Sequence, residues 1–67
     1  MFSIIELQTN GGTTLHIYQT AETREQAMSK YHSVLSSAAV SNVEIHTCFV
    51  VDEHGRYIAR ECYEHNA

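Results

Sequence analysis

Hydrophobic and polar residues follow two different periods along this chain. A period of two, typical of strands, recurs in four segments rich in β-branched and aromatic residues. These segments are residues 2–9, 13–19, 43–51 and 56–63. Asn10-Gly11-Gly12 separates the first two segments and suits the positive φ of a hairpin turn. The turn Asp52-Glu53-His54-Gly55 separates the last two, so the pattern predicts two β-hairpins.

The segment between the hairpins has the period of a helix, which we expect over residues 21–39. Thr20 is a candidate N-cap, and Glu22 suits the positive end of the helix dipole. Ser41-Asn42 ends the periodic segment. The apolar residues recur at helical spacing and predict one buried face. They are Ala27, Met28, Tyr31, Val34, Leu35 and Ala38.

This order of elements predicts an α+β fold of the type β-β-α-β-β, with a four-stranded antiparallel sheet and one helix packed on one face. The 67 residues suffice for a single domain over positions 1–67, with a short tail at residues 64–67. A chain of this length buries only about 60% of its unfolded surface, so it uses nearly every apolar residue or gains surface from a partner.

The expected strand registers divide the apolar residues of the sheet into two sets. A three-residue loop in the first hairpin pairs Thr9 with Thr13, and the second hairpin pairs Asp52 with Arg56, which places His46 opposite Cys62. One set is Ile5, Leu7, Leu15, Ile17, Cys48, Val50 and Ile58. The other is Phe2, Ile4, Tyr18, Ile45, Phe49, Val51, Tyr57 and Tyr63.

One helix covers one face of such a sheet, so the chain has a surplus of apolar surface. A large exposed apolar patch usually marks an interface, and Tyr and Phe are enriched in interface cores. We therefore expect the second set to form an interface, either in a homodimer or with a different protein. The alternative is that the aromatic residues are scattered over an ordinary surface. The pattern leaves open which face of the second hairpin meets the helix.

The charge balance narrows the classes of partner. Eight acidic and four basic residues give a net charge of −4, and the pI is about 5.6. The basic residues form no cluster, whereas nucleic-acid-binding domains normally carry a basic stripe, so no nucleic-acid partner is expected. The longest apolar run is Cys48 to Val51, and no segment resembles a signal peptide. We expect no membrane partner and a cytoplasmic location.

Histidine and cysteine residues are the candidates for chemistry. His46, Cys48, Cys62 and His65 could bind a metal ion or a small ligand, which is the alternative function. Zinc needs three or four convergent ligands, and no Cys-x₂-Cys or His-x₃-His spacing occurs, so no metal or cofactor is expected. A thiol nucleophile activated by His46 lacks a recognisable oxyanion loop or cleft. The sequence therefore predicts a protein that is not an enzyme and has no catalytic residue.

Three runs carry a resemblance that spans most of the chain. They are Ile5 to Gly11 (IELQTNG), His16 to Thr20 (HIYQT) and Tyr31 to Leu35 (YHSVL). These runs resemble short uncharacterised proteins of gut anaerobic bacteria and of their phages and mobile elements. The resemblance implies no catalytic or binding residue. It implies an accessory role on a mobile element, such as an inhibitor of host defence.

Overall fold

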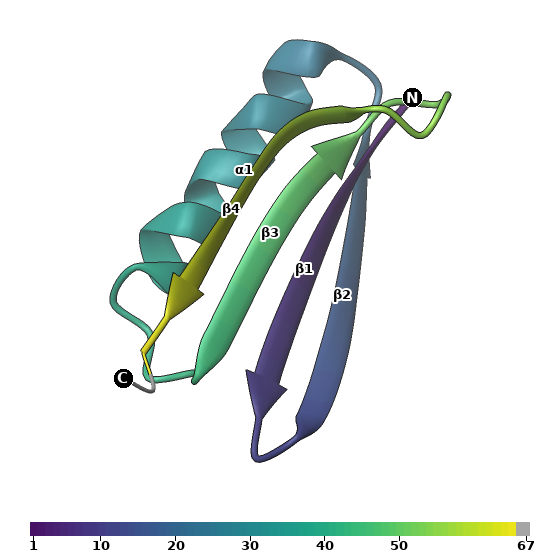
Figure 1. Cartoon of the computed structure of the whole chain (residues 1–67). Coiled ribbons are helices and arrows are strands. Elements are labelled where there is room, and N and C mark those ends of the chain that lie inside the picture. The colour runs from purple at the N-terminus through teal and green to yellow at the C-terminus, as the bar shows by residue number, and fades with distance from the viewer. Residues whose placement is uncertain (66–67) are drawn as a thin grey trace.

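Four strands form one antiparallel sheet, and a single helix packs on one of its faces (Figure 1). This computed structural model describes residues 1–65. The strand order across the sheet is β2-β1-β3-β4, which confirms the predicted β-β-α-β-β architecture. The elements are β1 (Phe2–Asn10), β2 (Thr13–Ala21), α1 (Arg24–Ala38), β3 (Ile45–Val51) and β4 (Tyr57–Glu64).

The first hairpin turns over two residues rather than the expected three. Gly11 and Gly12 have φ of 56° and 82°, and Asn10 pairs with Thr13. Two consecutive positive φ values suit the tight turn that matches strand twist, and glycine adopts them without a steric penalty. The predicted pairing of Thr9 with Thr13 is therefore wrong by one residue, and Thr9 pairs with Thr14. This slip moves β1 side chains to the other face relative to β2.

The second hairpin begins as expected and then changes register. The Asp52 N–H donates to the Arg56 carbonyl at 3.0 Å, and Val51 pairs with Tyr57. Val50 then pairs with Ala59, so Ile58 is the extra residue of a β-bulge. Beyond the bulge the predicted register is wrong by one residue.

The helix begins later than the sequence predicts. The side chain of Thr23, not Thr20, caps it by accepting a hydrogen bond from the Gln26 N–H at 3.2 Å. Residues 20–21 continue β2 instead, and Ala21 is buried at its end. The predicted helix face is confirmed, because four of its residues are buried and two pack against them. These residues are Ala27, Tyr31, Val34 and Ala38, with Met28 and Leu35 beside them.

The core lies between α1 and what we call the inner face of the sheet. β1 contributes Ile4, β3 contributes Cys48 and Val50, and β2 contributes only Ala21. Side chains alternate along a strand, so the even-numbered residues of β1 and β3 share this face with the odd-numbered residues of β2. The helix thus shields the middle of the sheet, and most of β2 lies outside its cover.

The chain end continues the sheet beyond the expected boundary. Of the tail predicted over residues 64–67, Glu64 ends β4, and the His65 N–H donates to the Glu44 carbonyl at 2.7 Å. Residues 66–67 lie outside the described residues. Within residues 1–65, no helix has the length and apolar content needed to cross a bilayer.

Candidate functional site

The face of the sheet opposite α1, which we call the open face, carries four rows of side chains that run across all four strands. Each row follows from the strand registers and from the alternation of side chains. Taken from β2 to β4, the rows are Thr20–Ser3–Val51–Tyr57, Tyr18–Ile5–Phe49–Arg60, His16–Leu7–Thr47–Cys62 and Thr14–Thr9–Ile45–Glu64.

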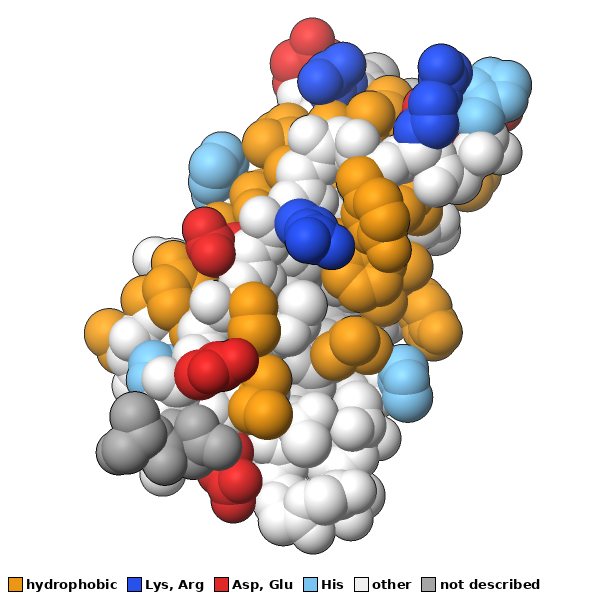
Figure 2. Space-filling model, viewed as in Figure 1, with side chains coloured by type: hydrophobic (Ala, Val, Ile, Leu, Met, Phe, Trp, Pro, Cys, Tyr) orange, Lys and Arg blue, Asp and Glu red, His pale blue; other side chains and the backbone are white. Residues whose placement is uncertain are grey.

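The open face has an apolar centre and a more polar margin. Ile5 and Leu7 on β1 and Phe49 and Val51 on β3 form the centre, and each is only partly buried because no second layer covers it. Threonines occupy much of the margin near the β1–β2 turn. Figure 2 shows hydrophobic side chains gathered over the middle of the strands, with uncharged polar side chains toward one end. An apolar core with a polar rim is the usual anatomy of a protein interface.

Aromatic contacts link several side chains of this surface to one another. The rings of Phe49 and Tyr57 meet edge to face, with centroids 5.5 Å apart. The Arg60 guanidinium carbon lies 5.8 Å from the centroid of the Tyr57 ring, a cation–π contact. Tyr57 and Tyr18 flank the centre from opposite strands and are 62% and 67% exposed. These contacts restrict the side chains involved, and a surface restricted in this way would lose less entropy on binding.

Almost none of the charge of the chain lies on the open face. Of the four basic and eight acidic residues, it holds Arg60 and Glu64, whose charges cancel. The net charge of −4 therefore belongs entirely to the rest of the molecule. Two copies that approach through this face meet no net repulsion across it.

The structure corrects three members of the predicted interface set. Ile4 is 1% exposed in the core, and Phe2 packs against that core from the same inner face. Tyr63 pairs with His46 and also belongs to the inner face. The two-residue turn and the bulge at Ile58 are the physical reasons for these errors, since each reverses the face of the residues beyond it. The other five residues, Tyr18, Ile45, Phe49, Val51 and Tyr57, lie on the open face, and the prediction missed Ile5 and Leu7.

The four candidate metal ligands do not converge. His46 and Cys48 are buried on the inner face, whereas Cys62 pairs with Thr47 on the open face. The predicted pairing of His46 with Cys62 is therefore wrong. His65 contacts the carbonyl of Ala38 through Nε2 at 2.9 Å. No cluster of three or more metal-ligating side chains occurs within residues 1–65.

The two thiols have different surroundings. Burial raises the pKa of Cys48 to about 11, and the nearby Glu6 carboxylate adds to the shift. Cys48 thus stays protonated near neutral pH and behaves as a small core residue. Cys62 is exposed, and its Sγ accepts from the Thr47 hydroxyl at 3.3 Å. It lines a pocket of about 450 Å³ with Thr47, Arg60 and Glu61.

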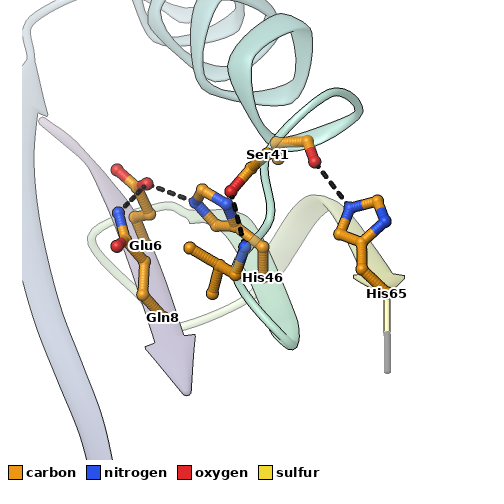
Figure 3. A network of polar contacts seen from close by, with 7 residues as sticks. Glu6, Gln8, Ser41, His46 and His65 are labelled. Carbon is orange, nitrogen blue, oxygen red and sulfur yellow. Dashed lines mark hydrogen bonds and ion pairs between the residues drawn. The ribbon is translucent and has the colours of Figure 1, made fainter. Parts of the chain in front are cut away.

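One polar pair on the inner face, in which His46 is buried and Glu6 is partly buried, was not predicted from the sequence. Nε2 of His46 contacts Oε2 of Glu6, and the Gln8 amide donates to the same oxygen at 2.9 Å (Figure 3). Nδ1 of His46 is buried and has no hydrogen-bond partner within residues 1–65. The predicted pairing of Thr9 with Thr13 would have placed Glu6 opposite His16, whereas Glu6 pairs with Ile17. The contact joins β1 to β3, which no turn connects, so the sequence offered no local signal for it.

No family model, curated protein or solved structure matches this chain. The resemblance to short proteins of gut bacteria and phages therefore stays a prediction.

Proposed function

We propose that this protein is a non-enzymatic interaction module that binds a second copy of itself through the open face. The observation that carries this proposal is the apolar centre of Ile5, Leu7, Phe49 and Val51, which α1 leaves uncovered. Packing two such faces together would give each sheet a second covered side, as in a β-sandwich.

The size of the face agrees with this role. Four strands spaced about 4.8 Å apart and seven to nine residues long, at about 3.3 Å per residue, present roughly 500 Å² per copy. Two copies would bury about 1,000 Å², the area at which specific interfaces begin. Each copy is a small domain with limited burial of its own, so this added burial contributes to its stability.

The charge distribution favours a second copy over a strongly charged partner. The face is neutral overall, and its two charged side chains have opposite signs, so it offers a charged partner little electrostatic complementarity. Two copies of an acidic protein can associate through a surface that carries no net charge, because the surfaces in contact do not repel each other.

Analytical ultracentrifugation of the wild type and of lysine variants tests the proposal. Leu7→Lys places a charge at the apolar centre, and Tyr57→Lys places one at an exposed site where the fold tolerates it. Both variants are expected to halve the mass of the assembly. Val40→Lys is the matched control, because Val40 is 86% exposed and lies off the sheet, so it leaves the mass unchanged.

A wild-type protein that sediments at the chain mass of 7.6 kDa up to high micromolar concentration would overturn the proposal. An assembly whose mass neither Leu7→Lys nor Tyr57→Lys alters would place self-association elsewhere on the molecule and would equally overturn it. Circular dichroism of each variant verifies that it is folded.

A further inference from the structure

The two edge strands of the sheet, β2 and β4, differ in the features that prevent pairing with another chain. The β4 edge carries a β-bulge and the charged residues Arg60, Glu61 and Glu64, which are devices that protect an edge strand from pairing with other chains. The β2 edge runs for nine residues, TTLHIYQTA, without an acidic residue, lysine, arginine or proline. Unguarded edges of this length expose a row of backbone N–H and C=O groups.

The inner side of β2 also lacks a cover. Leu15 and Ile17 face the side of the sheet where α1 packs, but β2 contributes only Ala21 to the core. Leu15 is 57% exposed as a result. The same strand presents Tyr18, 67% exposed, on the open face. β2 therefore combines free backbone groups with apolar side chains on both of its sides.

One backbone group of this edge is already occupied. The Lys30 ammonium on α1 donates to the carbonyl of Thr20 at 2.7 Å. In a two-residue turn the N–H after the turn points to the residue before it, so odd-numbered residues of β2 direct their backbone groups to β1. Even-numbered residues direct theirs outward, in agreement with the Lys30 contact to Thr20. The stretch that remains available is residues 13–19.

We infer that β2 pairs antiparallel with β2 of a second copy, in a register centred on His16. The outward-facing backbone groups belong to even-numbered residues, so the pairing can be centred on any of these. The register centred on His16 leaves the Lys30 contact to Thr20 intact and uses all of residues 13–19. It places Leu15 opposite Ile17 of the second copy, and Thr14 opposite its Tyr18. Both apolar residues of the inner side thus meet an apolar residue across the new strand pair, twice by symmetry.

The resulting assembly is a two-fold symmetric dimer in which β2 no longer has a free edge. The two-fold axis of an antiparallel strand pair stands perpendicular to the sheet, so both α1 helices lie on the same side. The sheet becomes eight-stranded, with the guarded β4 strands at its two ends. No Asp, Glu, Lys or Arg side chain faces another across the pair, because residues 13–21 include none of these residues. This interface uses different residues from the open-face centre and does not depend on it.

Leu15→Lys tests the edge without touching the open face. Leu15 is exposed, so the single chain tolerates lysine there, and Val40→Lys is again the matched control. With both interfaces present, the wild type sediments at four times 7.6 kDa, and Leu15→Lys or Leu7→Lys alone halves that mass. The combined variant sediments at the chain mass. A wild-type dimer that Leu15→Lys dissociates and Leu7→Lys does not would support the edge interface and remove the open-face proposal.

Hydrogen exchange supplies a readout that mass does not. Edge pairing protects the amides of Thr14, His16 and Tyr18, and Leu15→Lys is expected to abolish that protection while the β1–β3 amides stay protected. Fast exchange at all three amides in the wild-type assembly would overturn the inference, as would a mass that Leu15→Lys leaves unchanged.

Discussion

The carboxylate of Glu6 contacts the imidazole of His46 beneath the helix, from two strands that lie far apart in the sequence. Their side chains are 14% and 4% exposed, so water does little to satisfy either group. Removing one partner of such a pair leaves the other buried without a hydrogen bond, which costs more than the pair itself contributes.

We expect Glu6→Ala to lower the free energy of unfolding by roughly 2 kcal/mol, because His46 would then have no partner for either ring nitrogen. Replacing both residues together, as Glu6→Leu with His46→Leu, should recover most of that loss. Urea unfolding at a fixed protein concentration measures both effects. The exposed Glu53→Ala is the control, and an equal effect of Glu6→Ala and Glu53→Ala would show that the contact contributes nothing.

The helix cap gives a second prediction. Thr23→Ala removes the acceptor of the Gln26 N–H and should cost about 1 kcal/mol of stability. Thr20→Ala, at the position that the sequence suggested as the cap, should change the stability by less than about 0.5 kcal/mol, since Lys30 binds the backbone carbonyl there and not the side chain. Thermal unfolding of the two variants separates the outcomes, and a larger loss for Thr20→Ala would contradict the assignment.

The two thiols should react at different rates with a thiol reagent. Cys62 is exposed and should be labelled in the folded protein, whereas Cys48 is 1% exposed with a pKa raised to about 11 and should be labelled only on unfolding. Cys62→Ser is therefore expected to abolish fast labelling near neutral pH. Mass spectrometry after timed quenching measures the rates, and fast labelling that persists in Cys62→Ser would contradict the burial of Cys48.

The stability of the protein should depend on pH through Asp52 in the turn of the second hairpin. Its pKa lies below the ordinary value of 3.8, mainly because the Arg56 N–H donates to its carboxylate, with a further hydrogen bond from the His54 N–H and the charge of Arg56. A carboxyl with a lowered pKa in the folded state stabilises the protein above its unfolded pKa, and this contribution is lost as the pH falls through the folded pKa.

Asp52→Asn should therefore be less stable than the wild type near neutral pH, and the difference should shrink as the pH falls below about 4. Urea unfolding at a series of pH values measures this difference, with Glu53→Gln as the control in the same turn. A difference that stays constant down to strongly acidic pH would exclude ionisation of Asp52 as its cause.

The sequence predicted which elements exist and the order in which they follow, because period, turn residues and β-propensity are local properties. The predicted strand registers were wrong where the position of a single residue determines which residues pair. Asn10 pairs with Thr13 instead of belonging to a three-residue turn, and Ile58 bulges out of β4. The strand period is two, so an error of one residue in the register exchanges the two faces of a strand. The error at the first turn is the one that placed Ile4 in the predicted interface instead of the core.

The open face was half predicted for the same reason. One helix cannot cover both apolar faces of a four-stranded sheet, and in the structure α1 covers only the inner face. The composition of the face needs the register, which explains why Ile5 and Leu7 were assigned to the wrong side. The contact of Glu6 with His46 joins two strands that no turn connects, and a single sequence carries no local signal for such a pairing.

The central position of β1 also has a consequence for refolding. A two-residue turn joins β1 to β2, so these two strands can pair early. The other edge of β1 pairs only when β3, which follows the helix in the sequence, docks and brings Phe49 opposite Ile5. A two-stranded ribbon forms within about 10 microseconds and is only marginally stable alone. Until β3 docks, this ribbon has two free edges and exposes both apolar sets to other chains. The yield of refolding from denaturant should consequently fall as the concentration of protein rises.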